Sequence, residues 1–432
     1  MNFIKKMNMS PTMKYAIAEG ATYNAAYIGT QGFIFTTLSI YFNATPLQLS
    51  IMTTMPLAAS MIQIIIPYLY RIFRNRKELL VITAFFARIA TVLIPISILF
   101  DFTNSYILFV VMMIFSIFSS FTGNVWTSAM KQIVPDSVRG SYFGLRNYIT
   151  SIITVVFTMV YSYLMKTDST KLGLLIVSTL MFIFFISSVF LLSKHSIPDT
   201  LIKKDKIDNP FTPFKDKDFR KYLLFTSFWN FSIEFCKPFF SYYQVAILKA
   251  DYTFLGFAST ISALLSMFLY ILYGKFSDKF GNKNTIRIGI IFSLTGPLIF
   301  LFMTPDNYIM MTLLDAFITS FAWAAINLGY FNLLLESAKE PSEMYFSLNA
   351  FICGISAIAA SFIGGNLGNL LQKKSFVIFD HLFFGIQFIF FLEILLRIIS
   401  ILILNRVKTA KGEKKFTLFD ILPEINSMLK RN

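Results

Sequence analysis

The chain has little charge, little cysteine and little histidine. Only 14% of its 432 residues are charged and 56% are hydrophobic, with a mean hydropathy of +0.64. A soluble domain carries about 25% charged residues, so this composition excludes an ordinary water-soluble fold. The two cysteines, Cys236 and Cys353, lie in apolar stretches, and His195 and His381 are isolated. This pattern indicates neither a disulfide framework nor a metal site.

Motifs of catalysis and of nucleotide binding are also missing. The sequence contains no G-x-x-x-x-G-K-[ST] phosphate loop, no G-x-G-x-x-G after a strand, and no Ser or Cys with a plausible His base. We therefore expect that the chain is not an enzyme, needs no cofactor and does not hydrolyse ATP. Any transport would be driven by a solute or ion gradient.

Long hydrophobic runs, separated by charge, Pro or Gly, are the main feature of the sequence. About 20 apolar residues cross a bilayer as a helix, so these runs predict an all-α membrane protein with twelve transmembrane helices. The spans are expected near residues 14–42, 47–70, 79–100, 105–130, 142–164, 171–193, 221–248, 253–273, 286–304, 307–333, 345–370 and 380–404.

Lys and Arg are distributed unevenly between alternate loops. With the N-terminus placed inside, the inner segments hold 30 of the 38 basic residues and the outer loops hold 5. This bias predicts a multi-pass protein of the plasma (inner) membrane with both termini cytoplasmic. It also explains the net charge of +15 by topology and attraction to anionic lipid of the bilayer, so nucleic acid is not expected as a partner.

A polar segment between spans six and seven divides the chain into two halves. We expect an N-terminal six-helix bundle over 1–193, a cytoplasmic linker over 194–220, a C-terminal bundle over 221–405 and a cytoplasmic tail over 406–432. Identities at near-constant offsets suggest a repeat: Asn24 with Asn230 and Ala44 with Ala250 at 206, and Asn124 with Asn327 and Leu145 with Leu348 at 203. Parallel six-helix repeats are a known transporter design.

The loop between spans eight and nine carries the most informative motif. Residues 274–284 read GKFSDKFGNKN, which resembles the G-x-x-x-D-[RK]-x-G-[RK]-[RK] signature of the major facilitator superfamily. Gly274 would allow close helix approach, Asp278 could accept N–H groups of a neighbouring helix start, and Gly281 would allow the reversal. Residues 134–144, which contain Arg139, are similar to another inner loop of that family. The loop between spans two and three departs from it, with Arg71 at the acid's position.

The resemblance implies a fold, a mechanism and a cavity. It implies two six-helix pseudo-repeat halves that rock about a central site, with spans one, four, seven and ten lining the cavity. It also implies secondary active transport of a small organic solute, by a chain that we expect to be a monomer. Protons are the expected coupling ion.

Ionisable residues inside the spans are candidates for coupling, because charge in hydrocarbon is costly. Glu393 and Arg397 are four residues apart and are expected to pair with each other. Asp315 lies at nearly the depth of Glu234 and Lys237, which occupy one polar face of span seven. Another acid and a cation beside a carboxylate would suit a proton site, so Asp315, Glu234 and also Glu19 are the predicted coupling residues.

Polar and aromatic residues on the expected cavity spans are candidates for substrate binding. They are Tyr23, Asn24, Tyr27 and Gln31 on one face of span one, Trp229, Asn230, Glu234 and Lys237 on span seven, and Trp323 on span ten. Such groups also hold membrane helices together, so a packing role is the competing interpretation. The expected gating residues are Gly274, Asp278, Gly281 and Arg139.

Three functions fit these features. Uptake of a sugar or another polar metabolite suits the Asn, Gln, Tyr and Trp groups, whereas multidrug export would favour an apolar cavity lined by Phe and Met. A transporter-like sensor or lipid-handling protein is an alternative of a different class. Density for a ligand, or the residues that line the cavity, would separate these interpretations.

Overall fold

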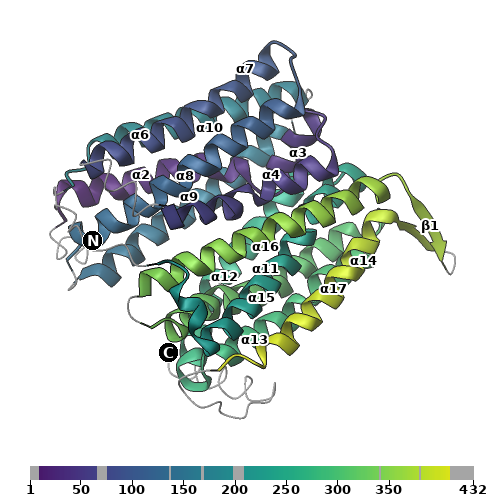
Figure 1. The fold of residues 1–432 in the computed structure, drawn as a ribbon. Helices are drawn as coiled ribbons and strands as arrows, with labels where there is room; N and C mark the ends of the chain where they lie inside the picture. The colour runs from purple at the N-terminus through teal and green to yellow at the C-terminus, as the bar shows by residue number, and fades with distance from the viewer. Residues whose placement is uncertain are drawn as a thin grey trace, which may run out of the picture.

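The computed structural model describes residues 9–65, 75–135, 138–166, 170–197, 209–339, 342–378 and 381–408. Within these ranges the helices follow one another as twelve rods, each crossing the molecule from end to end (Figure 1). The first six rods, in purple and blue, form one group, and the last six, in green and yellow, form another. We call these groups the N half and the C half.

The N half contains six rods, three of them interrupted. They are α2 (Pro11–Tyr27) with η1 (Ile28–Thr30) and α3 (Gly32–Tyr41); α4 (Pro46–Ala59) with η2 (Ser60–Ile65); α6 (Arg76–Ile89) with η3 (Ala90–Val92) and α7 (Leu93–Leu99); α8 (Ser105–Ile133); α9 (Arg139–Met165); and α10 (Thr170–Ser193).

The C half follows the short η5 (Thr212–Lys215). Its rods are α11 (Lys217–Tyr242) with the π-helical η6 (Tyr243–Ile247); α12 (Tyr252–Phe280); α13 (Asn282–Ser293) with α14 (Thr295–Leu301); α15 (Tyr308–Ser337); α16 (Ser342–Leu371); and α17 (Gly385–Leu404). Strands β1 (Ser375–Ile378) and β2 (His381–Phe384) lie between α16 and α17.

Ten helical segments of the described chain are long and apolar enough to cross a membrane. The other two rods are the first and the seventh, for different reasons. The first is divided into helices of 17 and 10 residues, and the seventh, α11, includes charged and amide side chains such as Asn230, Glu234 and Lys237. Both rods are the ones that carry most of the predicted binding residues, and polarity and a break are expected where a membrane helix lines a cavity.

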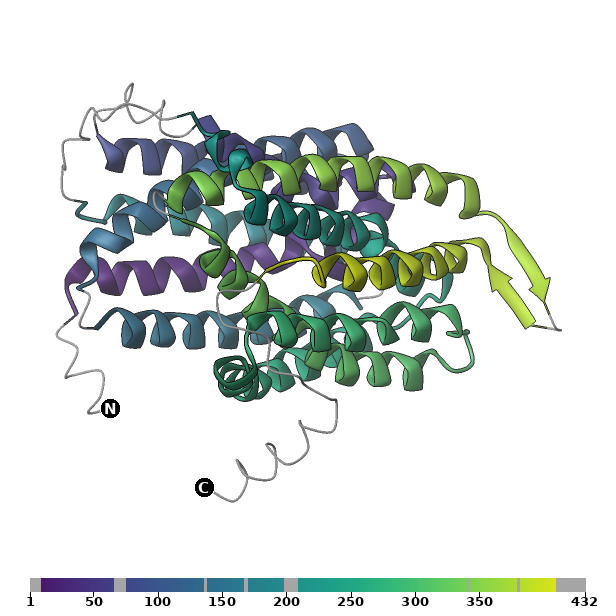
Figure 2. The ribbon, with the colours of Figure 1, turned by 60° about the horizontal axis from the view of Figure 1, so that its bottom comes forward.

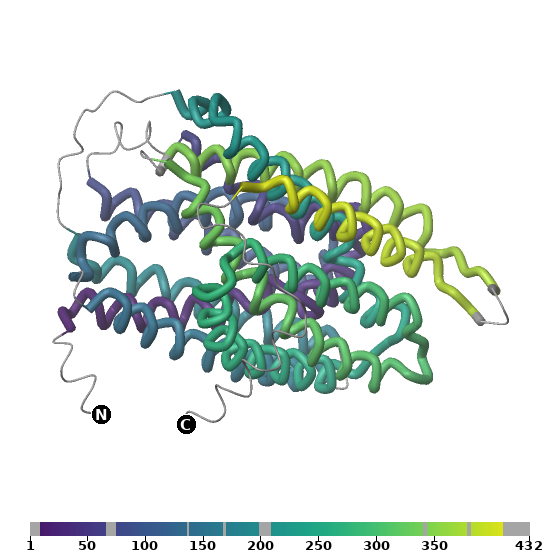
Figure 3. Tube along the Cα trace, turned by 90° about the horizontal axis from the view of Figure 1, so that it is seen from below, coloured from purple at the N-terminus to yellow at the C-terminus, as the bar shows by residue number. Residues whose placement is uncertain are grey.

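Two predicted spans have different boundaries in the structure. The span expected at 14–42 is broken because Gln31 is extended (φ −136°, ψ 163°) and Gly32 has a φ of +56°, a value that suits glycine. The span expected at 380–404 begins only at Gly385, and the preceding residues form an unpredicted antiparallel hairpin in which Ser375 pairs with Phe384. Figures 2 and 3 show this hairpin projecting from the bundle.

The helix starts repeat between the two halves. The first, second and third rods begin at Pro11, Pro46 and Arg76, and their counterparts begin 206 residues later. The fourth and fifth rods begin at Ser105 and Arg139, and their counterparts begin 203 residues later. These offsets equal those of the sequence identities, so the repeat extends to the helical frame.

The two halves meet along α4 with α16 and along α9 with α12. We call the end where α2 begins and α17 ends the termini end, and the opposite end the far end (Figure 1). A core cluster at the far end includes residues of both halves, among them Phe35 and Leu38 with Ala250 and Leu255. Near the termini end, the cluster around Tyr142 belongs to the N half and the cluster around Tyr222 belongs to the C half. The shared apolar core of the two halves therefore lies at the far end.

Candidate functional site

A cavity of about 440 Å³ lies within the C half, between α11, α15, α17 and the start of α14. Six of the predicted residues line it: Trp229, Asn230, Glu234, Lys237, Asp315 and Trp323. Its other lining residues are Ile233, Phe240, Gly296, Thr319, Ile326, Asn327, Tyr330, Phe331, Glu393 and Arg397. The structure therefore brings together the polar face of span seven and the acid of span ten.

The polar face of α11 is stabilised by hydrogen bonds to neighbouring protein groups. Residues three or four apart share a helix face, which places Asn230, Glu234 and Lys237 on one side. The Asn230 amide donates to the Thr226 carbonyl at 2.7 Å and to the Tyr330 hydroxyl at 2.8 Å. Asn230 therefore fixes Tyr330 of α15 at the cavity wall and leaves its own carbonyl oxygen as an acceptor.

Glu234 and Lys237 form an ion pair, with the Lys237 ammonium 2.8 Å from Glu234 Oε1. The Glu234 side chain is 5% exposed and that of Lys237 is 50% exposed, so the ammonium is the accessible partner. The second oxygen of Glu234 accepts a hydrogen bond of 3.0 Å from the Thr54 hydroxyl on α4, in the N half. A cavity carboxylate thus contacts the opposite half of the molecule.

Glu393 and Arg397 also pair, as their spacing on α17 predicts. Arg397 Nε donates to Glu393 Oε1 at 2.9 Å, and Arg397 Nη1 donates to the Ser293 carbonyl of α13. Both side chains are at most 4% exposed. The pair neutralises itself and fastens α17 to α13 behind the cavity.

Asp315 differs from the other two acids of the cavity. In the described part of the chain, its carboxylate has neither a hydrogen-bond donor nor an ion-pair partner within contact distance. Its nearest neighbour on α14 is Gly296, where a Cβ would lie 3.4 Å from Asp315 Oδ1. The cavity lining thus contains three carboxylates and two basic side chains, and the acid without a partner is Asp315.

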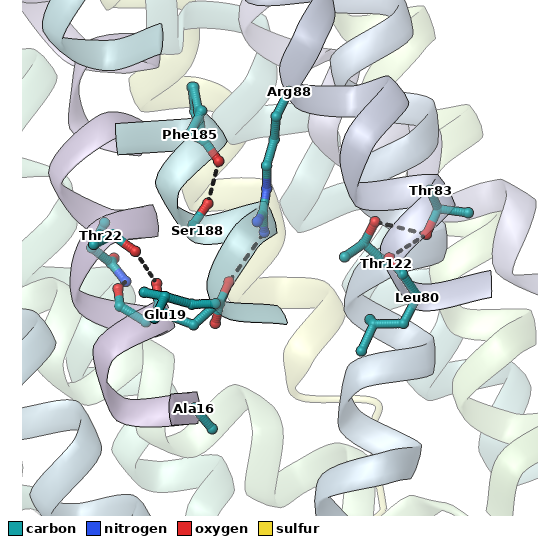
Figure 4. A network of polar contacts seen from close by, with 12 residues as sticks. Ala16, Glu19, Thr22, Leu80, Thr83, Arg88, Thr122, Phe185 and Ser188 are labelled. Carbon is teal, nitrogen blue, oxygen red and sulfur yellow. Dashed lines mark hydrogen bonds and ion pairs between the residues drawn. The ribbon is translucent and has the colours of Figure 1, made fainter. Parts of the chain in front are cut away.

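Glu19 lies in a separate polar cluster in the N half (Figure 4). Its Oε1 is 3.1 Å from Arg88 Nη2 and its Oε2 is 3.7 Å from Arg146 Nη2. The Arg88 guanidinium also lies 5.0 Å from the centre of the Tyr23 ring. Glu19 is therefore a buried counter-ion of two arginines and does not line the cavity of the C half.

The remaining predicted binding residues of span one lie outside that cavity. Tyr23 stacks on Tyr27 with ring centres 5.3 Å apart, and the Asn24 amide donates to the Gly20 carbonyl of its own helix at 2.7 Å. Gln31 lies at the break before Gly32 with an extended backbone, and its side chain stays close to that of Tyr27. Gln31 lines a second cavity of about 210 Å³ between α3, α9 and α12. Of the four candidates on span one, Gln31 therefore lines the second cavity, while Tyr23, Asn24 and Tyr27 line neither of the two described cavities.

The loop with the signature motif is held differently from the prediction. Gly281 reverses the chain with a φ of +89°, as expected. The expected close approach at Gly274 is wrong, because a Cβ there would meet no atom within 4 Å. Asp278 is exposed and contacts no donor within the described residues. The start of α13 is instead held by Glu336, which accepts from the Asn282 amide at 2.6 Å.

Arg139 joins α9 to the preceding helix. Its Nη2 donates to the carbonyls of Lys131 at 2.9 Å and Val134 at 3.3 Å, at the C-terminal end of α8. A cation is favourable there because helix carbonyls concentrate negative charge at that end. Arg71, where the sequence departs from the signature, lies outside the described residues, as do most of the linker and of the tail.

Several lining residues were not singled out from the sequence. Thr319, Trp323, Asn327 and Tyr330 recur at three- or four-residue intervals on α15, so the helical period around Trp323 could have identified them. Glu393 and Arg397 were expected to pair, but nothing in their spacing indicates a cavity beside them. Thr54 gave no signal, since a Thr in a membrane helix usually bonds its own backbone.

The fold and the cavity define a polytopic helical transporter. The family described as Major Facilitator Superfamily matches residues 20–361. Because this match covers most of the chain, the protein belongs to the major facilitator superfamily, and it is a multi-pass membrane protein and a secondary transporter of a small-molecule substrate. No curated protein sequence matches the chain.

Solved structures share the fold at low identity. A mutant form of the nucleoside transporter NupG has a TM-score of 0.69 at 14% identity, over 91% of this chain and 100% of that one. A D-xylose–proton symporter has a TM-score of 0.67 at 14% identity, over 93% and 99%. A bacterial homologue of the iron transporter ferroportin, in an inward-facing state, has a TM-score of 0.66 at 12% identity, over 91% and 98%.

Proposed function

We propose that the protein is a proton-coupled transporter of a small polar organic solute, and that Asp315 carries the proton. The observation that carries this proposal is the excess of acid in the cavity. Glu234 pairs with Lys237 and Glu393 pairs with Arg397, which leaves the carboxylate of Asp315 without a partner among the described residues. A lone carboxylate away from water is stabilised by binding a proton or a cation.

The lining of the cavity favours a polar, partly planar solute. Trp229 and Trp323 offer ring faces, while Asn230, Asn327 and Tyr330 offer hydrogen-bonding groups. Pairing of rings with amides and hydroxyls suits hydroxylated solutes such as sugars or nucleosides. Two proteins of similar structure, a nucleoside transporter and a D-xylose–proton symporter, carry solutes of this class.

The transport cycle would move the bundles of residues 1–193 and 221–405 against each other about the central cavity. The halves share an apolar core at the far end, so this conformation is closed there. The absence of a contact for Asp278 among the described residues fits a state in which a latch at the termini end is released. In the opposite state, Asp278 would gain its partner near the start of α16.

Uptake into proteoliposomes tests the coupling directly. Radiolabelled xylose, uridine and a panel of polar metabolites would be offered with an inward proton gradient, with an inward sodium gradient, and with neither. We expect accumulation of at least one solute with the proton gradient, which an uncoupler abolishes. Accumulation that follows the sodium gradient alone would show that sodium, and not a proton, is the coupling ion. Uptake that ignores both gradients would contradict coupling.

The orientation in the membrane follows from the basic residues. We infer that the termini end is cytoplasmic, because the segments on that side carry 30 Lys and Arg against 5 on the other. Single cysteines at positions 104 and 306 should react with an impermeant thiol reagent added outside cells. Cysteines at positions 206 and 412 should be protected, and the reverse pattern would overturn this orientation.

A further inference from the structure

The contact between Thr54 and Glu234 joins the cavity to the interface of the two halves. Thr54 lies on α4 and is 1% exposed, and its hydroxyl is 3.0 Å from Glu234 Oε2. The other oxygen of Glu234 is 2.8 Å from Lys237 Nζ, which lines the cavity. One carboxylate therefore connects an accessible ammonium with a buried hydroxyl of the opposite half.

The neighbouring Thr53 shows the backbone hydrogen bonds that Thr54 does not make. Thr53 donates to the carbonyls of Leu49 and Ser50 on its own helix, each at 3.0 Å. Such bonds to the preceding turn are the usual state of a threonine in a membrane helix. Thr54 could bond the preceding turn of its own helix in the same way, yet its hydroxyl donates across the interface to Glu234. It consequently has two arrangements, one bonded to Glu234 and one bonded to its own backbone.

The other described polar contacts of the α4 rod with the C half are made to α16. The Leu47 amide donates to Asn369 Oδ1 of α16 at 3.1 Å, and the Ser60 hydroxyl contacts the Ala350 carbonyl of α16 at 3.3 Å. Thr54 lies between these two contacts, and its partner lies on α11 instead. The Thr54 bond is therefore the polar contact by which α4 reaches the cavity helix.

We propose that Thr54 is a positioning residue that makes the packing of the two halves depend on the state of the cavity. A proton on Glu234 removes the charge that Glu234 presents to the Thr54 hydroxyl. Hydrogen bonds to ionised groups are stronger than those to neutral ones, so loss of that charge weakens the contact. Thr54 then returns to its own helix, and α4 is freed from α11.

The population of the two conformations provides the test. Spin labels on cysteines introduced at Ser141 of α9 and Lys275 of α12 would report the opening of the termini end. Both positions are exposed, whereas the native Cys236 and Cys353 are buried. Distances between the two labels would be measured by double electron–electron resonance on the full chain. The variants compared are Thr54→Val, Thr54→Ser and Thr53→Val.

We expect Thr54→Val to shift the population by about tenfold toward the state closed at the termini end, because the bond exists in the present, far-end-closed state. Thr54→Ser keeps the hydroxyl and should behave as the parent. Thr53→Val removes the same atoms without an interface contact and should also behave as the parent. Equal populations in Thr54→Val and the parent would overturn the proposal.

A second background separates the bond from any packing effect of valine. In a Glu234→Ala chain, the added Thr54→Val change should have no further effect, since the acceptor is already gone. A full tenfold shift in that background would also overturn the proposal. The inference rests on the proposed alternating cycle but not on its solute or ion. If uptake proves uncoupled while these shifts appear, only the proposal that Asp315 carries a coupling proton is contradicted.

Discussion

The N half and the C half share a helical frame but treat their buried charges in opposite ways. In the N half, Glu19 is enclosed between Arg88 and Arg146, and the cluster borders neither described cavity. In the C half, Asp315 faces a cavity without a partner among the described residues. The same helical frame thus holds a carboxylate paired with arginines in the N half and an unpaired carboxylate in the C half.

This difference separates two roles that a buried charge can have. A carboxylate paired with two arginines is costly to disturb, because removal of one partner leaves an uncompensated charge. A carboxylate without a partner can exchange a proton or a ligand without breaking an existing pair. The paired acids Glu19 and Glu393 therefore contribute to stability, and exchange is expected at Asp315.

The largest effect is expected from Asp315→Asn. An amide has a similar shape but carries no proton at neutral pH, so gradient-driven accumulation should fall to the equilibrium level. Solute exchange across equal concentrations should persist, because the other lining residues remain. Counterflow and uptake in the same proteoliposomes would measure the two activities. Asp306→Asn, at an exposed acid outside the cavity, is the matched control and should be silent. Retained accumulation in Asp315→Asn would move the coupling role to Glu234.

Arg88→Met tests the Glu19 cluster of the N half. The change leaves Glu19 with only the 3.7 Å contact to Arg146, and breaking a buried pair costs about 3–5 kcal/mol. Thermal unfolding in detergent should show a clearly lower midpoint. Lys171→Met removes the partner of Asp101 in a solvent-exposed pair of the same half and should cost at most about 1 kcal/mol. Equal decreases of the unfolding midpoint in both variants would show that the Glu19 cluster stabilises the fold no more than an exposed ion pair does.

A smaller effect is expected at Gly281. Its φ of +89° favours glycine, so Gly281→Ala should cost about 1–2 kcal/mol of strain in the turn between α12 and α13. Gly274→Ala is the control, since the open space around it should make the change nearly neutral. The comparison of unfolding midpoints would be contradicted if Gly274→Ala proved the more damaging of the two.

The smallest effect is expected at the far end, where Lys166 and Asp251 form an ion pair of 3.3 Å between the halves. Burial opposes the ionised form of Asp251, but the Phe254 N–H and the Lys166 ammonium outweigh it, and the pKa of Asp251 lies below its ordinary value. The pair thus stabilises the closed far end above about pH 4, and its contribution is lost as the pH falls through the lowered pKa. Both side chains are partly exposed, so less than about 1 kcal/mol is expected. Spin-label distances at the far end should become pH-independent over this range in Asp251→Asn.

The sequence could predict features that depend on spacing along one helix. Hydrophobic length predicted the rods, the four-residue interval predicted the pair of Glu393 with Arg397, and the three-residue interval placed Glu234 and Lys237 on one face. The structure added contacts that depend on how distant helices rotate. Glu19 with Arg146 and Glu234 with Thr54 join residues more than a hundred positions apart, and no local pattern specifies them.

Breaks in helices were the other feature that spacing could not give. The apolar run around Gln31 reads as one continuous span, and only the backbone angles of Gln31 and Gly32 show that the helix ends and restarts there. The hairpin before α17 was missed for a related reason. Its last residues, Leu382, Phe383 and Phe384, are as apolar as the following helix, so composition alone cannot separate strand from span there.

The change of repeat offset from 206 to 203 means that the stretch from the start of the third rod to the start of the fourth is three residues shorter in the C half. From the start of α6 to the start of α7 the chain takes 17 residues, whereas from α13 to α14 it takes 13. The difference of four residues is close to one helical turn of 3.6 residues, and one residue is regained before the fourth rod begins. A whole turn changes the length of a rod but nearly preserves the direction in which later side chains point. The third rods of the two halves could therefore differ in length while the rest of each rod presents nearly the same face.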